Sequence, residues 1–120
     1  MNGWSLWQYR DVVNSFLDQC DQGMQNVLLR RLGKLLETGV ECKMPVSEPI
    51  GDGLFALHGS SGRRWARLIY YFGENRQIIF VHAFFKKTNK IKRQDINISK
   101  RIRDSIKERK EISSEINLAS

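Results

Sequence analysis

The chain has 120 residues, an ordinary globular composition and a formal net charge of +7. That length supports one modest hydrophobic core, so we expect a single domain over residues 1–120. We find neither a cationic leader followed by an apolar stretch nor an apolar run near the roughly 20 residues that span a bilayer. We therefore expect a cytoplasmic protein with no membrane partner. The charge favours an anionic partner, with nucleic acid as the first candidate.

The positive charge is concentrated in one segment. Residues 86–110 contain eleven Lys and Arg against three Asp and Glu. Such clusters are often a solvated helix face, but their density also suits contact with phosphates. Cys20 and Cys42 have no metal-ligand spacing and make no disulfide framework. We interpret both as reduced structural thiols, and we expect no metal and no cofactor.

The N-terminal third predicts a short strand followed by a helical hairpin. Aromatic residues at positions 4, 7 and 9 suit a strand. Asp11 and Asp21 are good N-caps for two helices, and Gly39 stands where a helix C-terminus favours glycine. Apolar residues spaced by three and four give each helix one buried face. These residues are Val12, Val13, Phe16, Leu17 and Cys20 in the first helix, and Met24, Val27, Leu28, Leu32, Leu35 and Leu36 in the second.

Residues 63–88 predict a β-hairpin at the centre of the fold. Two nearly continuous apolar runs, Trp65–Phe72 and Ile78–Phe85, flank the turn-forming Gly73-Glu74-Asn75. Continuous rather than alternating apolar residues are typical of inner strands covered on both faces. Because helices precede and follow this cluster of strands, the order of elements favours an α+β fold with an antiparallel sheet.

The remaining segments give weaker patterns. Two prolines and two glycines interrupt residues 40–53, which we interpret as a loop. Leu54–His58 predicts a short strand, and residues 59–62 a turn into the hairpin. Isoleucines at a spacing of four predict a third, strongly cationic helix, with Ile98, Ile102 and Ile106 on its apolar side. The last ten residues either extend this helix or fray.

Strand alternation predicts a cationic site on one side of the sheet. His58, Arg67 and Lys86 converge there if their strands pair as neighbours. Arg67 would hold a phosphate and stabilise the transition-state charge, while a lysine near other cations would act as acid or base. A histidine can protonate a leaving 5′ oxygen. Such a site would cleave RNA without a metal, using the 2′-hydroxyl as nucleophile.

Each of these residues also has a structural explanation. A strand histidine is often only hydrogen-bonded, and Lys86 and Lys87 also fit a solvated strand end. A charge such as Arg67 inside an apolar strand is harder to explain, because it needs a partner or a task. The hairpin aromatics suit the core, and Tyr71 is the best candidate to stack on a base.

The chain also resembles a known family. Residues 52–96, DGLFALHGSSGRRWARLIYYFGENRQIIFVHAFFKKTNKIKRQDI, are similar to the HigB-like toxins of the RelE superfamily, found in bacterial and prophage toxin–antitoxin modules. The most specific element is Phe-x-Lys-Lys-Thr at Phe84–Thr88, and the likeness extends over roughly residues 10–108. The family pattern has an Asp-Gly-Leu-aromatic-Glu-Leu-Arg strand, a strand with an aromatic residue, an arginine and a tyrosine, and a closing Phe-x-Lys-Lys-Thr. These parts correspond here to Asp52–His58, Trp65–Tyr70 and His82–Thr88.

The resemblance implies a RelE-like fold, with an antiparallel β-sheet, two N-terminal helices and a C-terminal helix. It also implies ribosome-dependent mRNA cleavage and a cognate antitoxin that carries a helix-turn-helix. By motif position, Arg67 matches the family's strand arginine, and Lys86 and Lys87 match its paired lysines. Where the family has glutamate and then arginine, this chain has Ala56 and His58.

Three hypotheses follow. The first is an endoribonuclease toxin that acts on mRNA at the ribosome, with catalysis by His58, Arg67, Lys86 and Lys87, and RNA contacts from Arg63, Arg64, Tyr71, Lys90, Lys92 and Arg93. The second, motivated by Ala56 and His58, is a non-catalytic relic of the same fold that binds RNA, DNA or an antitoxin. The third is a structural phage or regulatory protein whose partner covers the sheet.

Overall fold

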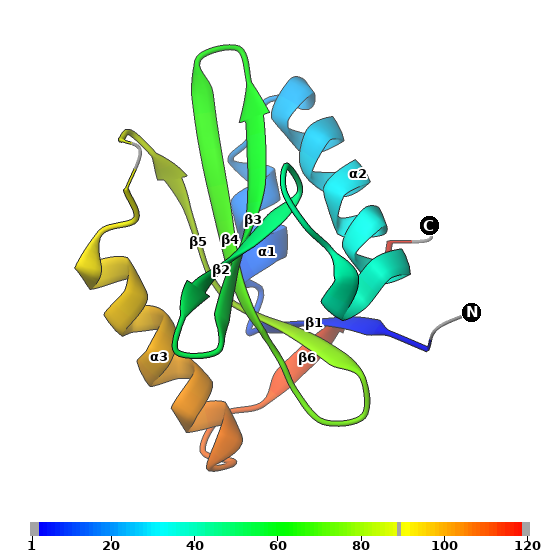
Figure 1. Ribbon diagram of the computed structural model, residues 1–120, viewed down its shortest axis with the longest axis vertical. Coiled ribbons are helices and arrows are strands. Elements are labelled where there is room, and N and C mark those ends of the chain that lie inside the picture. The colour runs from blue at the N-terminus through cyan, green and yellow to red at the C-terminus, as the bar shows by residue number, and fades with distance from the viewer. Residues whose placement is uncertain (1–2, 89, 119–120) are drawn as a thin grey trace.

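The computed structural model describes residues 3–88 and 90–118. In this part of the chain it confirms an α+β fold, with a six-stranded sheet and three α-helices (Figure 1). The elements in chain order are β1 (Ser5–Tyr9), α1 (Val12–Asp18), α2 (Gln22–Thr38), the 3-10 helix η1 (Gly39–Glu41), β2 (Ser47–Gly51), β3 (Leu54–Ser61), β4 (Arg64–Phe72), β5 (Gln77–Lys86), α3 (Arg93–Lys107) and β6 (Ser113–Ile116).

The sheet has the strand order β2-β3-β4-β5-β1-β6 and is mixed rather than purely antiparallel. β1 pairs with β5 in parallel, from Ser5 opposite Gln77 to Gln8 opposite Phe80. All other neighbouring pairs are antiparallel. The parallel pair is possible because no turn joins β1 to β5; the chain between them passes through both N-terminal helices and three strands.

The inner strands are buried on both faces, as their continuous apolar runs predicted. One face packs against the helical hairpin of α1 and α2, and we call it the hairpin face. The contacts include Val13, Leu28, Leu57, Leu68 and Phe80. The opposite face, which we call the α3 face, packs against α3 (Figure 1). Its buried residues are Leu54, Ala56, Ile69, Tyr71, Ile79 and Val81.

The two N-terminal helices begin with different caps. The Asp21 carboxylate accepts a hydrogen bond from the Met24 backbone N–H at 2.8 Å, as expected of an N-cap. Asp11 makes no such bond. The Oε1 atom of Gln8, on β1, instead accepts from the backbone N–H groups of Val13 and Asn14 at 3.0 and 3.1 Å. A side chain distant in sequence thus satisfies the free donors of α1.

Two strands lie where the sequence predicted none. β2 lies inside residues 40–53, and its one proline, Pro49, is tolerated because β2 is an edge strand whose outer backbone needs no partner. β6 lies in the last ten residues, which neither extend α3 nor fray at Ser113–Ile116 but pair with β1. β3 also continues to Ser61, so the turn into β4 is shorter than expected.

Gly39 and Gly33 give a matched test of the helical hairpin. Gly39 has φ of 55°, and an added Cβ would lie 2.2 Å from the Trp4 ring. We expect Gly39→Ala to lower the free energy of unfolding by about 2 kcal/mol or more, from overpacking and backbone strain. Gly33 lies inside α2 with open space around it, so Gly33→Ala should raise stability by about 0.5–1 kcal/mol. Urea denaturation of both variants measures this, and equal effects would contradict the packing described here.

Helix α3 covers only part of its face of the sheet. Its inward side consists of Ile96, Ser99, Ile102 and Ile106, so the predicted stripe was wrong in including Ile98. The β3–β4 hairpin extends well beyond α3 (Figure 1). Within the described residues, no helix is long and apolar enough to cross a bilayer.

Candidate functional site

Strand register brings His58, Arg67 and Lys86 together on the part of the α3 face that the helix itself does not cover. His58 on β3 lies directly opposite Arg67 on β4. Lys86 on β5 lies opposite Trp65, two residues before Arg67 on the same side of β4. The convergence predicted from strand alternation is therefore confirmed, while the catalytic roles of these residues stay a prediction. We call this group, with Glu48 described next, the cationic site.

Glu48 on β2 adds a carboxylate that the sequence interpretation missed. Its Oε1 atom lies 3.0 Å from Nε2 of His58, within hydrogen-bond distance. Glu48 lies directly opposite Ala56, so its side chain occupies the same side of the sheet. Glu48 thus places a carboxylate beside His58, although position 56 itself is an alanine. Ser47-Glu48-Pro49-Ile50 shows no alternation of apolar and polar residues, so the sequence carried no signal for this strand.

Arg67 is a buried cation without an ion-pair partner in the described chain. Only 8% of the residue is exposed. One Nη atom donates to the Ala66 carbonyl at 2.8 Å, while the buried Nε–H has no hydrogen-bond partner among the described residues. Among residues 3–88 and 90–118, no carboxylate lies within 4.0 Å of the guanidinium. Buried charges are normally paired or coordinated, so this arrangement fits a site for an anionic ligand.

The surroundings of the cationic site alter the proton affinity of its bases. Burial lowers the pKa of His58, and the Arg67 charge lowers it further, against an opposing effect of Glu48. The pKa of Lys86 is also lowered, first by burial and then by Arg67. His58 is therefore mainly neutral at pH 7 and can accept a proton, whereas Lys86 is a somewhat stronger acid than a free lysine.

Lysines at and just after the end of β5 line a hollow beside the cationic site, which we call the lysine hollow. Its volume is about 270 Å³, and Lys86, Lys87, Lys90 and Lys92 all line it. Lys86 belongs to both, so positive charge runs continuously from Arg67 to the start of α3. Arg93 is exposed in the first turn of that helix. Lys87 is exposed just past the end of β5 and contributes to the hollow rather than to the pair of His58 and Arg67.

Three predicted RNA contacts lie elsewhere. Arg64 stacks over Phe85, with Cζ 3.8 Å from the ring centre, on the hairpin face. Arg63 is exposed at the turn between β3 and β4. Tyr71 is 3% exposed because α3 covers it, so its ring does not offer the stacking surface we had expected. Burial also raises the pKa of Tyr71 to about 12.

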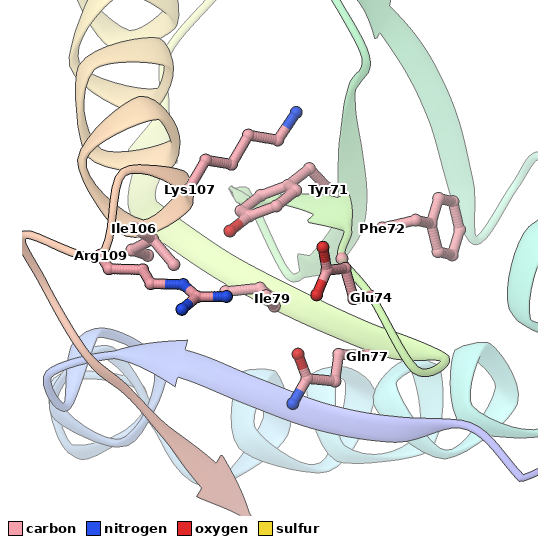
Figure 2. A pocket seen from close by; sticks show the side chains of 9 residues that line it. Tyr71, Phe72, Glu74, Gln77, Ile79, Ile106, Lys107 and Arg109 are labelled. Atoms are coloured by element: carbon pink, nitrogen blue, oxygen red, sulfur yellow. The ribbon is translucent and has the colours of Figure 1, made fainter.

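A larger pocket lies at the far end of β4, away from the cationic site. It has a volume of about 530 Å³ between the end of α3 and the β4–β5 turn. Arg109 points across it toward the side that carries Glu74 and Gln77 (Figure 2). The pocket is larger, but none of His58, Arg67 and Lys86 lines it. Size alone therefore does not make it the better candidate, because proton-transferring groups gather around Arg67.

Comparison with family models decides the family of this chain. Residues 15–104, well over half of the sequence, match the model described as "Phage derived protein Gp49-like (DUF891)". The chain belongs to the Gp49-like family. This family is one of RelE/HigB-like toxins, so the resemblance to the RelE superfamily holds at that level. No curated protein matched this Gp49-like chain.

The matched region contains the whole cationic site and most of α3. Polar contacts fix the position of this helix. His82 Nε2 lies 2.8 Å from Asp95 Oδ1, which joins β5 to the first turn of α3. Lys100 forms an ion pair with Asp52 at 3.3 Å, and Arg103 donates to the Asp52 carbonyl. These contacts hold α3 beside the cationic site rather than over it. Two of the positive charges of α3 thus bind Asp52 of this Gp49-like chain instead of facing a partner.

Proposed function

We propose that this chain is the toxin of a type II toxin–antitoxin module of the HigB type, an endoribonuclease that cleaves mRNA at the ribosome. The observation that carries the proposal is the buried guanidinium of Arg67, which has no ion-pair partner in the described part of the chain and lies beside a neutral histidine and a lysine. Membership of a RelE/HigB-like toxin family supports it. Its partners would be mRNA, the ribosome and a cognate helix-turn-helix antitoxin.

The chemistry would use the substrate's own 2′-hydroxyl. Neutral His58, oriented by Glu48, takes the proton from this hydroxyl as the oxygen attacks phosphorus. Arg67 stabilises the extra negative charge on the phosphoryl oxygens. Lys86 donates a proton to the 5′ oxygen as the P–O5′ bond breaks. The products are a 2′,3′-cyclic phosphate and a 5′-hydroxyl. His58 is thus better suited as a base than as the acid we first expected, because its pKa is lowered.

The test is induced expression together with mapping of RNA ends. Production of the wild-type chain should stop growth and translation, and mRNA should carry new 2′,3′-cyclic phosphate ends. Arg67→Ala should relieve the arrest. A harmless wild-type chain that leaves mRNA intact would contradict the proposal. RNA binding without cuts, weakened by Arg67→Ala, would instead support the non-catalytic relic.

The lysine hollow would guide the RNA backbone. Each lysine that contacts a phosphate releases bound counterions, with a salt slope of about 0.7 per contact for a single strand. We expect Lys92→Gln to weaken RNA binding for all sequences and to reduce the slope by about one such contact. Fluorescence anisotropy over a range of salt concentrations measures both.

The matched control is Lys34→Gln, because Lys34 is exposed on α2 at the hairpin face. It carries the same charge but lies on the other side of the sheet. An equal loss of slope in both variants would mean that overall charge, rather than the hollow, attracts the RNA.

A further inference from the structure

Beside Arg67 lies a small cleft that is separate from the lysine hollow and has no role in the chemistry described above. Its volume is about 220 Å³, less than the roughly 300–1,000 Å³ typical of pockets for drug-sized ligands. Arg67 and His58 form one side of it, so the cleft opens directly onto the cationic site. A ligand in the cleft would therefore touch the group that we expect to hold a phosphate.

The rim of this cleft carries two exposed apolar side chains. Trp65 is 41% exposed and Met44 is 58% exposed, although both are residue types that normally lie inside. Trp65 lies on β4 between Ser60 of β3 and Lys86 of β5, so strand pairing fixes its backbone on both sides. An indole ring that is attached to a fixed backbone and remains open to solvent is suited to stack on a flat ring.

Polar groups in the cleft match the edge of a base and the charge beside it. Ser60 is among the lining residues, and its hydroxyl can exchange hydrogen bonds with a base. Arg31, which donates to the Pro45 carbonyl, holds the segment that carries Met44 and adds a second positive charge. The cleft thus combines an aromatic ring, an apolar side chain and cations, as single-stranded nucleic-acid sites do.

We propose that this cleft binds one nucleobase of single-stranded RNA, stacked on Trp65, next to the phosphate held by Arg67. This inference rests on the proposed function and deepens it, because it names the part of the substrate that is recognised beside the scissile bond. Trp65 takes the role that the sequence had suggested for Tyr71. Stacking is possible at position 65 because α3 does not cover this end of β4.

The experiment uses 2′-O-methyl-ApA, a dinucleotide with one phosphate and no free nucleophile at the internal 2′ position. Binding is followed through the methionine methyl groups by NMR. Met44 lies on the rim of the cleft, whereas Met24 is buried in the core beneath Gly59 and reports on the integrity of the fold. The same titration is repeated with probes that lack the 5′ or the 3′ base, and with the variants Trp65→Leu and Trp65→Phe.

For the wild-type chain, ApA should shift the Met44 signal, and removal of one of the two bases should weaken binding by about 5- to 150-fold. Trp65→Leu should weaken ApA binding by a similar factor. This variant should bind ApA and the probe that lacks the recognised base equally well. Trp65→Phe should keep most of the distinction. An unchanged Met24 signal in each variant shows that the core is intact.

Three results would overturn the inference: no binding of ApA to the wild-type chain, no loss on removal of either base, or an equal loss in the wild-type chain and in Trp65→Leu. None of these results decides the proposed function. That is judged separately by RNA cleavage and by its loss in Arg67→Ala. A chain that cuts RNA but ignores the base would keep the proposed function without the base cleft.

Discussion

Replacement of Arg67 by methionine should abolish RNA cleavage while leaving the protein at least as stable. Removal of a preorganised group that stabilises transition-state charge typically lowers the rate by about 10²–10³-fold, and we expect a loss of at least this size. Arg67 is 8% exposed with an unsatisfied Nε–H, so the fold bears a desolvation cost without a compensating ion pair in its described part. Replacement of a whole buried ion pair by apolar side chains is often neutral or stabilising by about 1–4 kcal/mol, and a buried charge with no ion pair to lose should behave likewise.

The two readouts together separate function from structure. Cleavage is measured from the appearance of 2′,3′-cyclic phosphate ends, and stability from urea denaturation. Arg30→Met is the matched control, because Arg30 is exposed on α2 and lies away from the cationic site. It should change neither rate nor stability appreciably. A strongly destabilised Arg67→Met would mean that the guanidinium serves the fold, and the account of the site would then fail.

The second large effect concerns His58 and its pH dependence. His58→Gln should lower the cleavage rate by about 10²–10⁴-fold, the usual contribution of a general base. The rate for the wild-type chain should fall on the acidic side as His58 becomes protonated. Burial and Arg67 lower the pKa of His58, so the midpoint of this fall should lie below about 6.5, the ordinary value for histidine.

Glu48 provides the sharpest test of the pair. Its charge and its hydrogen bond both raise the pKa of His58, opposing burial, Arg67 and Lys86. Glu48→Gln should therefore move the acidic fall in rate to lower pH, while the maximum rate drops because the imidazole is less well oriented. His82→Gln is the control, since His82 pairs with Asp95 outside the cationic site. An unchanged pH profile in Glu48→Gln would show that the histidine at 58 is not the titrating base.

The lowered pKa of His58 also predicts how stability depends on pH. The unfolded chain binds a proton near pH 6.5, whereas the folded chain binds it only at lower pH. The free energy of unfolding should therefore fall as the pH decreases from about 6.5 through the folded-state pKa of His58. His58→Gln should remove this part of the dependence. A wild-type chain whose stability is flat over that range would contradict the assigned burial effect.

The central site could be predicted because it depends on local rules. Strand alternation fixes which side His58, Arg67 and Lys86 occupy, and the hairpin between β4 and β5 sets their order. The long apolar runs likewise predicted inner strands that are covered on both faces. These features need only the period of the strand and a turn signal, and both are visible in the sequence.

The missed parts depend on contacts between segments distant in sequence. Pro45 and Pro49 concealed β2, because a proline disfavours a strand except at a sheet edge, and the edge position is known only from the whole sheet. Glu48 was missed with it. β6 has four residues, too few to show a period. The pairing of β1 with β5 and the capping of α1 by Gln8 are also tertiary choices.

The exchange of roles between Tyr71 and Trp65 has the same origin. Both are aromatic residues on the same side of β4, and the sequence offers no reason to distinguish their exposure. The difference arises from where α3 ends its coverage: Tyr71 lies beneath it at 3% exposed, and Trp65 lies beyond it at 41%. Propensity and alternation can place a side chain on a face, but only packing decides which part of the face remains open.

The most direct measurement of the central claim is the Nε–H resonance of Arg67 during titration with 2′-O-methyl-ApA. The signal is assigned by its absence in Arg67→Met. If this buried guanidinium holds the phosphate, its resonance should shift along with binding and should be better protected from exchange with water. A resonance that stays unchanged while RNA binds would contradict the account, because the anion would then be held elsewhere.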